Sequence, residues 1–165
     1  MKIGFHLLNI MMWSLLSAVA TSCIAEEEPA EWSLAPGDRL PTFSVTTLDG
    51  TDISQASFEG KEGYIVFFTT TCGDCRRELP IMEEHYRQLT ATPEGREHVE
   101  FICISRGDDA ATVRDYWEAN GLTMPVAAPG DKGVYYLFAS VGVPRLYVTR
   151  GEVIEGVYVE RLMFH

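Results

Sequence analysis

Positive charge is scarce in this chain. Its 165 residues include 13 Lys and Arg against 24 Asp and Glu, which gives a formal net charge of −11 at pH 7. Because no run of basic residues offsets this excess, nucleic acids and anionic lipid surfaces are excluded as expected partners. Internal repeats are also absent, and the one low-complexity stretch is the short acidic run at Glu26–Glu28. The length suits one ordinary domain with a substantial core.

Cysteine is too sparse for a scaffold held by several disulfides, since the chain has four. Cys72 and Cys75 form a Cys-x-x-Cys pair, but a second pair at metal-ligand spacing is lacking. A zinc or copper module that uses this pair as half of its site is therefore only an alternative, and we expect no metal and no cofactor. Cys103 lies in the apolar run Val99–Ile104, so we expect a small buried core residue rather than a resolving thiol.

The first residues are typical of an export signal. Lys2 provides a positive start, residues 3–16 are mostly apolar, and the small residues 17–20 follow. The apolar run is short and interrupted, which disfavours an uncleaved membrane span. We therefore predict a signal peptide over residues 1–22.

Cys23 is a candidate for lipidation. The stretch Ala20-Thr21-Ser22-Cys23 is similar to a bacterial lipobox, in which the cysteine becomes the lipid-modified first residue. Residues 23–35 are then an acidic tether, and residues 36–165 form a domain held at the membrane. The expected location is thus extracytoplasmic, as a membrane-anchored lipoprotein facing the periplasm. The alternative is cleavage after Ala20, which would release a soluble periplasmic protein.

Hydrophobic periodicity predicts an α/β domain. Residues 43–48 alternate with period two and meet Asp49-Gly50, which indicates a hairpin. Tyr64 to Thr69 is a continuous apolar run, as expected of a strand buried on both faces. The remaining predicted elements are a strand at 99–104, helices at about 72–89 (kinked at Pro80), 108–119 and 132–140, and a closing hairpin at 146–149 and 152–158. This order favours a sheet with a largely parallel centre and an antiparallel edge.

The strand that ends near Thr69 leads directly into Cys72-Gly73-Asp74-Cys75, which opens the next helix. Residues i and i+3 lie on one helix face, so the two sulfurs can close a small disulfide ring. The Cys72 sulfur then lies at the helix N-terminus, where unpaired N–H groups and the helix dipole favour a thiolate. This layout predicts a redox-active dithiol.

Three segments resemble extracytoplasmic thioredoxin-like proteins of the TlpA/ResA type: residues 67–80 around the dithiol, Gly142-Val143-Pro144, and the hairpin at 43–50. The resemblance covers about residues 36–158. It implies a thioredoxin-like fold, in which a central mixed β-sheet is flanked by helices and carries an N-terminal β-hairpin extension. A shortened C-terminal helix is expected, because the last strand is followed only by a stub formed by Val157, Val159, Leu162, Met163 and Phe164.

The resemblance also implies the roles of individual residues. The expected catalytic residues are Cys72, Cys75, Glu78 and Pro144. Pro144 would be a cis-proline packed against the dithiol. Glu78 would accept the proton of Cys75 as a general base. The alternative for Glu78 is a solvated glutamate paired with Arg77 or His85.

Substrate contacts are expected from Val143, Arg145 and Thr71. The backbone of Val143 would pair with a bound peptide. Thr71 and Arg145 depart from the family pattern, which has tryptophan at the first position and a small polar residue at the second. Arg145 is expected either to add positive potential near Cys72 or to be a solvated edge residue.

The implied activity is thiol-disulfide exchange. The partners are a disulfide-containing protein substrate and a membrane thiol-reducing system that supplies electrons. Asp74 disfavours a thiolate on Cys72, and Arg76 and Arg77 partly offset its charge. We therefore predict a dithiol that leans toward reduction of its substrate, with a potential of roughly −200 to −270 mV.

Two alternatives use the same fold. The first is a thiol peroxidase, for which Thr69 has the right spacing before Cys72, whereas Ile65 replaces the proline of that signature. The second is a non-catalytic module that binds a partner protein or a metal.

Overall fold

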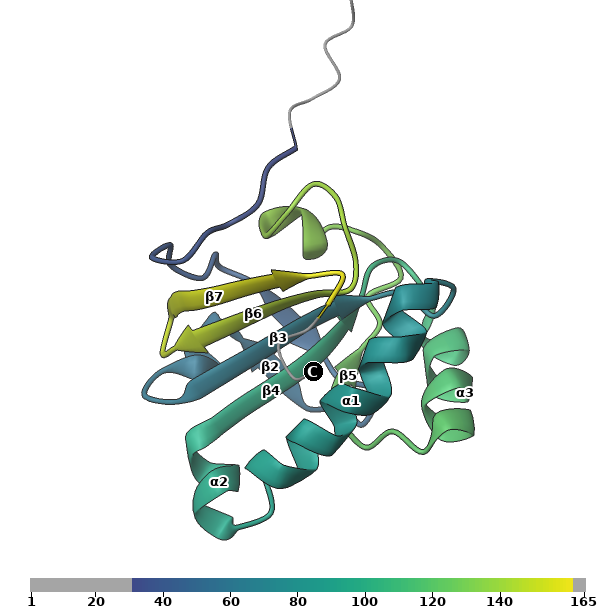
Figure 1. Cartoon of the computed structure of the whole chain (residues 1–165), viewed down its shortest axis with the longest axis horizontal. Helices are drawn as coiled ribbons and strands as arrows, with labels where there is room; N and C mark the ends of the chain where they lie inside the picture. Colours follow the sequence, from purple (N-terminus) through teal and green to yellow (C-terminus); the bar gives the residue numbers. More distant parts are fainter. Residues whose placement is uncertain (1–30, 162–165) are drawn as a thin grey trace, which may run out of the picture. The chain divides into compact units, whose positions relative to one another are not determined.

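The computed structural model of the chain describes residues 31–161 (Figure 1). The predicted signal peptide, Cys23 and most of the predicted tether lie outside these residues, as do Leu162, Met163 and Phe164 of the expected C-terminal stub. Within the described part of the chain, no helix has the length and apolar character needed to cross a bilayer.

A five-stranded mixed sheet with the order β5-β4-β3-β6-β7 forms the centre of the domain. The strands are β3 (Glu62–Phe68), β4 (Val99–Ser105), β5 (Val126–Ala127), β6 (Arg145–Arg150) and β7 (Val153–Val159). Strand β3 pairs in parallel with β4 and antiparallel with β6, so that Val66 lies opposite both Cys103 and Leu146. The predicted parallel centre with an antiparallel edge is confirmed. The two-residue strand β5 was not predicted, because it is too short to show a periodic pattern.

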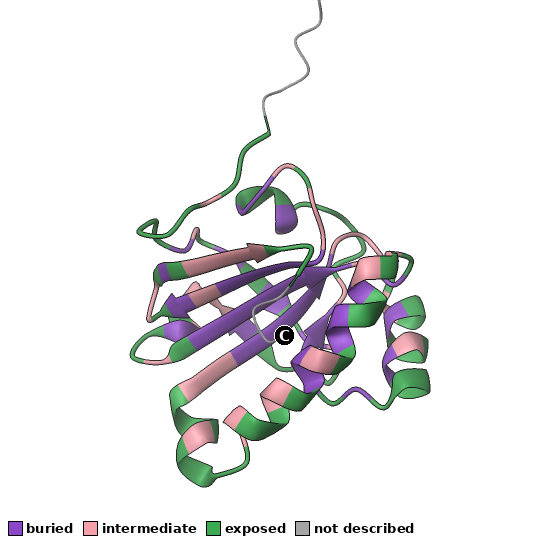
Figure 2. Cartoon of the chain, in the orientation of Figure 1, coloured by how far each residue is buried: buried purple, intermediate pink, exposed green. Residues whose placement is uncertain are grey.

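Each face of the sheet supports its own apolar cluster, and Figure 2 shows the central strands as largely buried. Alternate residues of β3 point to opposite faces, which is why its sequence is apolar throughout. Val66 and Phe68 pack with Cys75 and Leu79 of α1 (Gly73–Leu89) and with α3 (Ala110–Asn120). Ile65 and Phe67 pack with the N-terminal hairpin and with Phe58 and Phe138. Figure 1 shows α1 and α3 on one side of the sheet.

The two long helices begin and end where the sequence indicates. The Asp109 carboxylate caps α3 by accepting a hydrogen bond from the Thr112 N–H at 2.9 Å, and Gly121 ends the helix with a φ of 62° in the left-handed region. Helix α1 continues through Pro80. A short helix, α2 (Pro93–His98), was not predicted; it is capped by the Thr92 hydroxyl, which accepts from the Gly95 N–H at 3.1 Å.

The expected N-terminal hairpin is present as β1 (Ser44–Thr46) and β2 (Asp52–Ser54), which pair antiparallel. A 3-10 helix, η1 (Gln55–Phe58), follows it. Close packing against β3 requires Gly63, since a Cβ atom there would lie 2.2 Å from Thr149 Oγ1 and 2.3 Å from Phe58 Cδ1. The hairpin and η1 thereby cover the sheet face opposite α1.

The helix predicted for residues 132–140 is wrong, because only a 3-10 turn, η2 (Tyr135–Leu137), forms there. The backbone beyond this turn bonds to the segment that precedes the hairpin. Phe138 O accepts from the Leu34 N–H at 2.8 Å, and the Ser140 N–H donates to Trp32 O at 2.9 Å. Hydrogen bonds across the chain therefore replace those that would continue a helix.

The C-terminal prediction is partly wrong. Val157 and Val159 belong to β7 rather than to a stub after the last strand, and they pair with Tyr147 and Arg145 of β6. No described helix follows β7.

Candidate functional site

Cys72 and Cys75 lie at the first turn of α1. Cys72 is the N-cap residue, and its Sγ accepts a hydrogen bond from the Cys75 N–H at 3.3 Å. Cys72 is half-buried, Cys75 is fully buried, and both are free thiols in this structure. Cys72 is therefore the more accessible of the two sulfurs, whereas the protein shields Cys75 from solvent.

The two thiols also differ in chemistry. Burial raises the pKa of the Cys75 thiol far above its usual value, and the hydrogen bond to Cys72 and the nearby Asp74 charge raise it further. Cys75 therefore stays protonated at neutral pH, and its attack on a disulfide needs a proton acceptor.

Pro144 follows a cis peptide bond, as predicted. The loop that ends at Pro144 places Val143 next to Cys72, although the two residues are 71 positions apart in the sequence. The Cys72 S–H donates to Val143 O at 3.5 Å. Val143 is half-buried and packs against the apolar clusters on both sheet faces, so its position is held by the core.

Glu78 lies one turn after Cys75 on α1 and is 4% exposed. The alternative of a solvated glutamate is therefore wrong. Glu78 lines a surface pocket together with Arg77, Ile81 and Arg161. A carboxyl group in this position is shielded by the protein and adjoins a pocket open to water, which suits a group that passes protons between the interior and solvent.

Arg145 is 6% exposed, so of its two expected states the solvated edge residue is wrong. Its neighbour Leu146 packs in the cluster that contains Cys75, whereas Tyr147 packs in the cluster on the opposite face. Because side chains alternate along a strand, Arg145 lies on the Tyr147 face, away from α1. Its guanidinium donates to Ser33 Oγ at 2.8 Å and to Val141 O at 2.6 Å.

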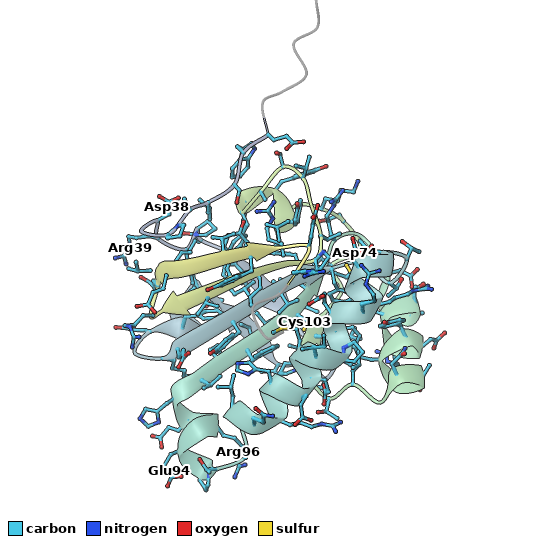
Figure 3. All side chains as sticks on the ribbon, viewed as in Figure 1. Asp38, Arg39, Asp74, Glu94, Arg96 and Cys103 are labelled. Atoms are coloured by element: carbon cyan, nitrogen blue, oxygen red, sulfur yellow. The ribbon has the colours of Figure 1, made fainter. Side chains whose placement is uncertain are left out.

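The charged residues next to the dithiol form an ion pair with each other or a hydrogen bond with the backbone. Asp74 forms an ion pair with Arg77, and Figure 3 shows Asp74 near the N-terminal end of α1. Arg76 Nε donates to Thr70 O at 2.7 Å. Both side chains of this pair are accessible to solvent, so Arg77 offsets the charge of Asp74 only in part, which fits the prediction. Thr71, which stands in place of a tryptophan, is exposed beside Cys72.

Asp108 is a site-shaping residue that the sequence analysis did not single out. Its Oδ2 accepts from the Thr70 N–H at 2.7 Å, so it links the segment between β4 and α3 to the loop before Cys72. The pair Asp108-Asp109 was predicted only to start a helix. Asp109 caps α3 as predicted, whereas the Asp108 carboxylate accepts a hydrogen bond from the loop before Cys72.

Cys103 is a core residue, as predicted. It is completely buried, and its S–H donates to Met124 Sδ at 3.8 Å. Burial raises the pKa of this thiol well above its usual value, which keeps it unreactive. Figure 3 shows Cys103 within the sheet. Over residues 31–161, no cluster of three or more His, Cys, Asp or Glu side chains is arranged to hold a metal ion.

The chain is similar in sequence to two thiol-disulfide oxidoreductases. The chain is 26% identical to the thiol-disulfide oxidoreductase ResA of Geobacillus thermodenitrificans over 118 residues, and 28% identical to that of Geobacillus kaustophilus over 112 residues. These alignments cover 72% and 68% of this chain but only 65% and 62% of the two relatives. The chain thus spans less than two thirds of the length of these proteins.

Among solved structures, a thiol:disulfide interchange protein of the thioredoxin family from Chlorobium tepidum is similar, with a TM-score of 0.62 and 27% identity. The match covers 77% of this chain and 88% of that one, and it confirms the thioredoxin-like fold. The Redoxin family model matches residues 35–142, which is more than half of the chain and includes the dithiol. The chain therefore belongs to the Redoxin family and is a thioredoxin-like protein of the ResA type.

Proposed function

We propose that this protein is a thiol-disulfide oxidoreductase that acts outside the cytoplasm and reduces substrate disulfides with Cys72 and Cys75. The observation that carries the proposal is the pairing of an accessible thiol with a buried one. Cys72 caps α1 next to the Val143 carbonyl, and Cys75 lies beneath it with its N–H on the Cys72 sulfur.

The first step is attack by the Cys72 thiolate on one sulfur of a substrate disulfide. A bond forms between Cys72 and that sulfur, the substrate S–S bond breaks, and the second substrate sulfur leaves as a thiolate that takes up a proton. The N–H groups at the start of α1 favour negative charge on Cys72. Val143 offers its backbone to an extended substrate segment, and the exposed Thr71 borders the same approach.

The second step is attack by Cys75 on Cys72. The mixed disulfide breaks, the substrate leaves fully reduced, and the protein retains a Cys72–Cys75 disulfide; two electrons have passed to the substrate. Cys75 must first lose a proton, which its environment holds tightly. Glu78 is the proposed acceptor, because it is buried one turn further along the same helix.

Turnover requires an external thiol donor to reduce the disulfide again. We propose a membrane thiol-reducing system, which fits an exported protein with a signal segment at 1–22 and a lipid anchor at Cys23. Secretion as a soluble periplasmic protein is the alternative outcome for the same segment. The Asp74 charge, which the exposed Arg77 only partly offsets, disfavours a thiolate on Cys72, and the expected potential therefore stays at the reducing end of the range.

Covalent trapping tests this function. A Cys75→Ser variant completes the first step and cannot complete the second, so it should accumulate mixed disulfides with a disulfide-containing protein. The matched Cys72→Ser variant should form few adducts, because the remaining Cys75 is buried and protonated. Non-reducing electrophoresis and mass spectrometry of the adducts provide the measurement. Equal adduct formation by both variants, or none by either, would contradict the proposal.

A further inference from the structure

The loop that presents Val143 to Cys72 is held from behind by Arg145. Three of its donors are used on neighbouring groups: Nη2 donates to Val141 O at 2.6 Å, Nε to Gly142 O at 3.5 Å, and Nη1 to Ser33 Oγ at 2.8 Å. Two of the three acceptors are backbone carbonyls of the residues that lead directly to Val143. The planar guanidinium can serve several acceptors at once in a fixed geometry, which an ammonium cannot do.

Gly142 shows how closely the guanidinium packs against this loop. Its φ of 90° lies in the left-handed region, and a Cβ atom on it would lie 3.2 Å from Arg145 Nη2. The Gly142 carbonyl also accepts from the Tyr135 hydroxyl at 2.9 Å. The backbone before Val143 is therefore bonded on two sides, and position 142 has a conformation and surroundings that favour glycine.

Arg145 is also an unusual group to bury. It is 6% exposed, and across residues 31–161 it forms no ion pair with a carboxylate. A buried cation that is satisfied only by neutral oxygens is costly compared with an apolar residue of the same volume. An apolar residue at this position could not form the bonds to Val141 and Gly142, and these bonds give the buried guanidinium a role.

We propose that Arg145 is a positioning residue for substrate binding: it holds the carbonyls of residues 141 and 142 so that the backbone of Val143 faces both Cys72 and an extended peptide. This inference rests on the proposed function. Arg145 acts through the loop and does not touch the reacting sulfurs. Its contribution therefore falls on substrates with a peptide backbone to align, whereas a small disulfide without a backbone reacts at Cys72 independently of the loop.

The test compares two disulfides in single-turnover reactions with the pre-reduced full-length protein. One is a model peptide closed by a single disulfide, and the other is bis(2-hydroxyethyl) disulfide. The variants are Arg145→Met, which keeps the volume and removes every donor, and Arg145→Lys, which keeps the charge and loses the planar fork. Arg150→Met is the matched control, because Arg150 is an exposed arginine on the same strand, paired with Glu155.

Both Arg145 variants should lose about 10-fold to 100-fold in the rate with the peptide, while their rate with the small disulfide stays near that of the wild type. Arg150→Met should match the wild type with both. The proposal is overturned if the Arg145 variants keep the peptide rate, or if the two rates fall in parallel as they would with partial unfolding. A wild-type protein that reduces neither disulfide would overturn the proposed function itself and this inference with it.

Discussion

Replacing Glu83 with glutamine should destabilise the domain by about 2–4 kcal/mol at neutral pH. Glu83 is 5% exposed within α1 and accepts four hydrogen bonds. Its Oε2 accepts from the N–H groups of Thr123 and Met124 at 2.7 and 3.1 Å. Its Oε1 accepts from Thr123 Oγ1 at 2.5 Å and from Arg87 Nε at 2.7 Å. One carboxylate thus fastens the helix that carries the dithiol to the loop before β5.

The magnitude follows from these four donors. Glutamine keeps the shape of glutamate, but it offers one acceptor oxygen and turns an NH2 group toward groups that also donate. Whichever way the amide lies, its NH2 group replaces a carboxylate oxygen that accepts two hydrogen bonds, and the remaining two lose their charged acceptor. A hydrogen bond to a charged group contributes about 1.5–3 kcal/mol, and rotation of the Thr123 hydroxyl and hydration of the exposed Arg87 reduce the total loss to the stated range. For a domain of this size, the loss lowers Tm by roughly 5–15 °C.

The effect should also depend on pH. Burial acts to raise the pKa of Glu83, but the hydrogen bonds from Thr123, Met124 and Arg87 outweigh it, and the net pKa is lower than the ordinary value of 4.5. A carboxylate whose pKa is lowered on folding stabilises the fold above its unfolded pKa. That contribution is lost as the pH falls through the lower, folded pKa. The difference between wild type and Glu83→Gln should therefore be constant above about pH 5 and shrink below about pH 4.5.

Denaturant unfolding of both proteins at a series of pH values provides the measurement. Glu84→Gln is the control, because Glu84 is the exposed neighbour and accepts one hydrogen bond from Gln88. It should change stability by less than about 0.5 kcal/mol. A Glu83→Gln variant that is as stable as the wild type, or a deficit that stays the same from pH 7 to pH 3, would refute the reasoning.

Three further outcomes are expected. Glu78→Gln should slow release of substrate from the Cys72 mixed disulfide about 10²-fold and leave formation of that disulfide unchanged. Quenched-flow alkylation follows both steps, and equal slowing of the two would exclude a base role. Cys103→Ala should retain dithiol exchange in the same assay, and a loss of exchange in folded protein would give this buried thiol a catalytic part. Gly63→Ala should destabilise the fold by about 1–3 kcal/mol or more in denaturant unfolding, because the added methyl group would overlap Thr149 and Phe58. Unchanged stability would contradict the packing described above.

The strands and helices next to the dithiol were predictable because local patterns specify them. The apolar run of β3, the Cys-x-x-Cys at the start of α1, and the Asp109 cap with Gly121 at the end of α3 each carry their signal within a few residues. The hairpin of β1 and β2 was equally visible from its alternation and from Asp49-Gly50. In these segments local preference and tertiary packing agree.

The errors lie where distant partners decide the structure. Residues 132–140 have a helical pattern, but Phe138 and Ser140 bond to residues 32–34, and the helix is reduced to one 3-10 turn. The burial of Arg145 could not be predicted, because its partner Ser33 is 112 positions away. The burial of Glu78 likewise depends on how α1 packs in the fold, which helical spacing alone does not give. Contacts of this kind leave no periodic trace in the sequence.

A redox titration of Cys72 and Cys75 tests the central claim most directly. The protein is equilibrated in buffers of defined thiol-disulfide potential, and free thiols are counted by mass after alkylation. The account predicts that both cysteines are lost together, reversibly and as a two-electron couple, with a midpoint at roughly −200 to −270 mV. A midpoint above about −150 mV would contradict the proposed reducing direction. Failure of Cys72 and Cys75 to form a disulfide with each other at any potential would contradict the function as a whole.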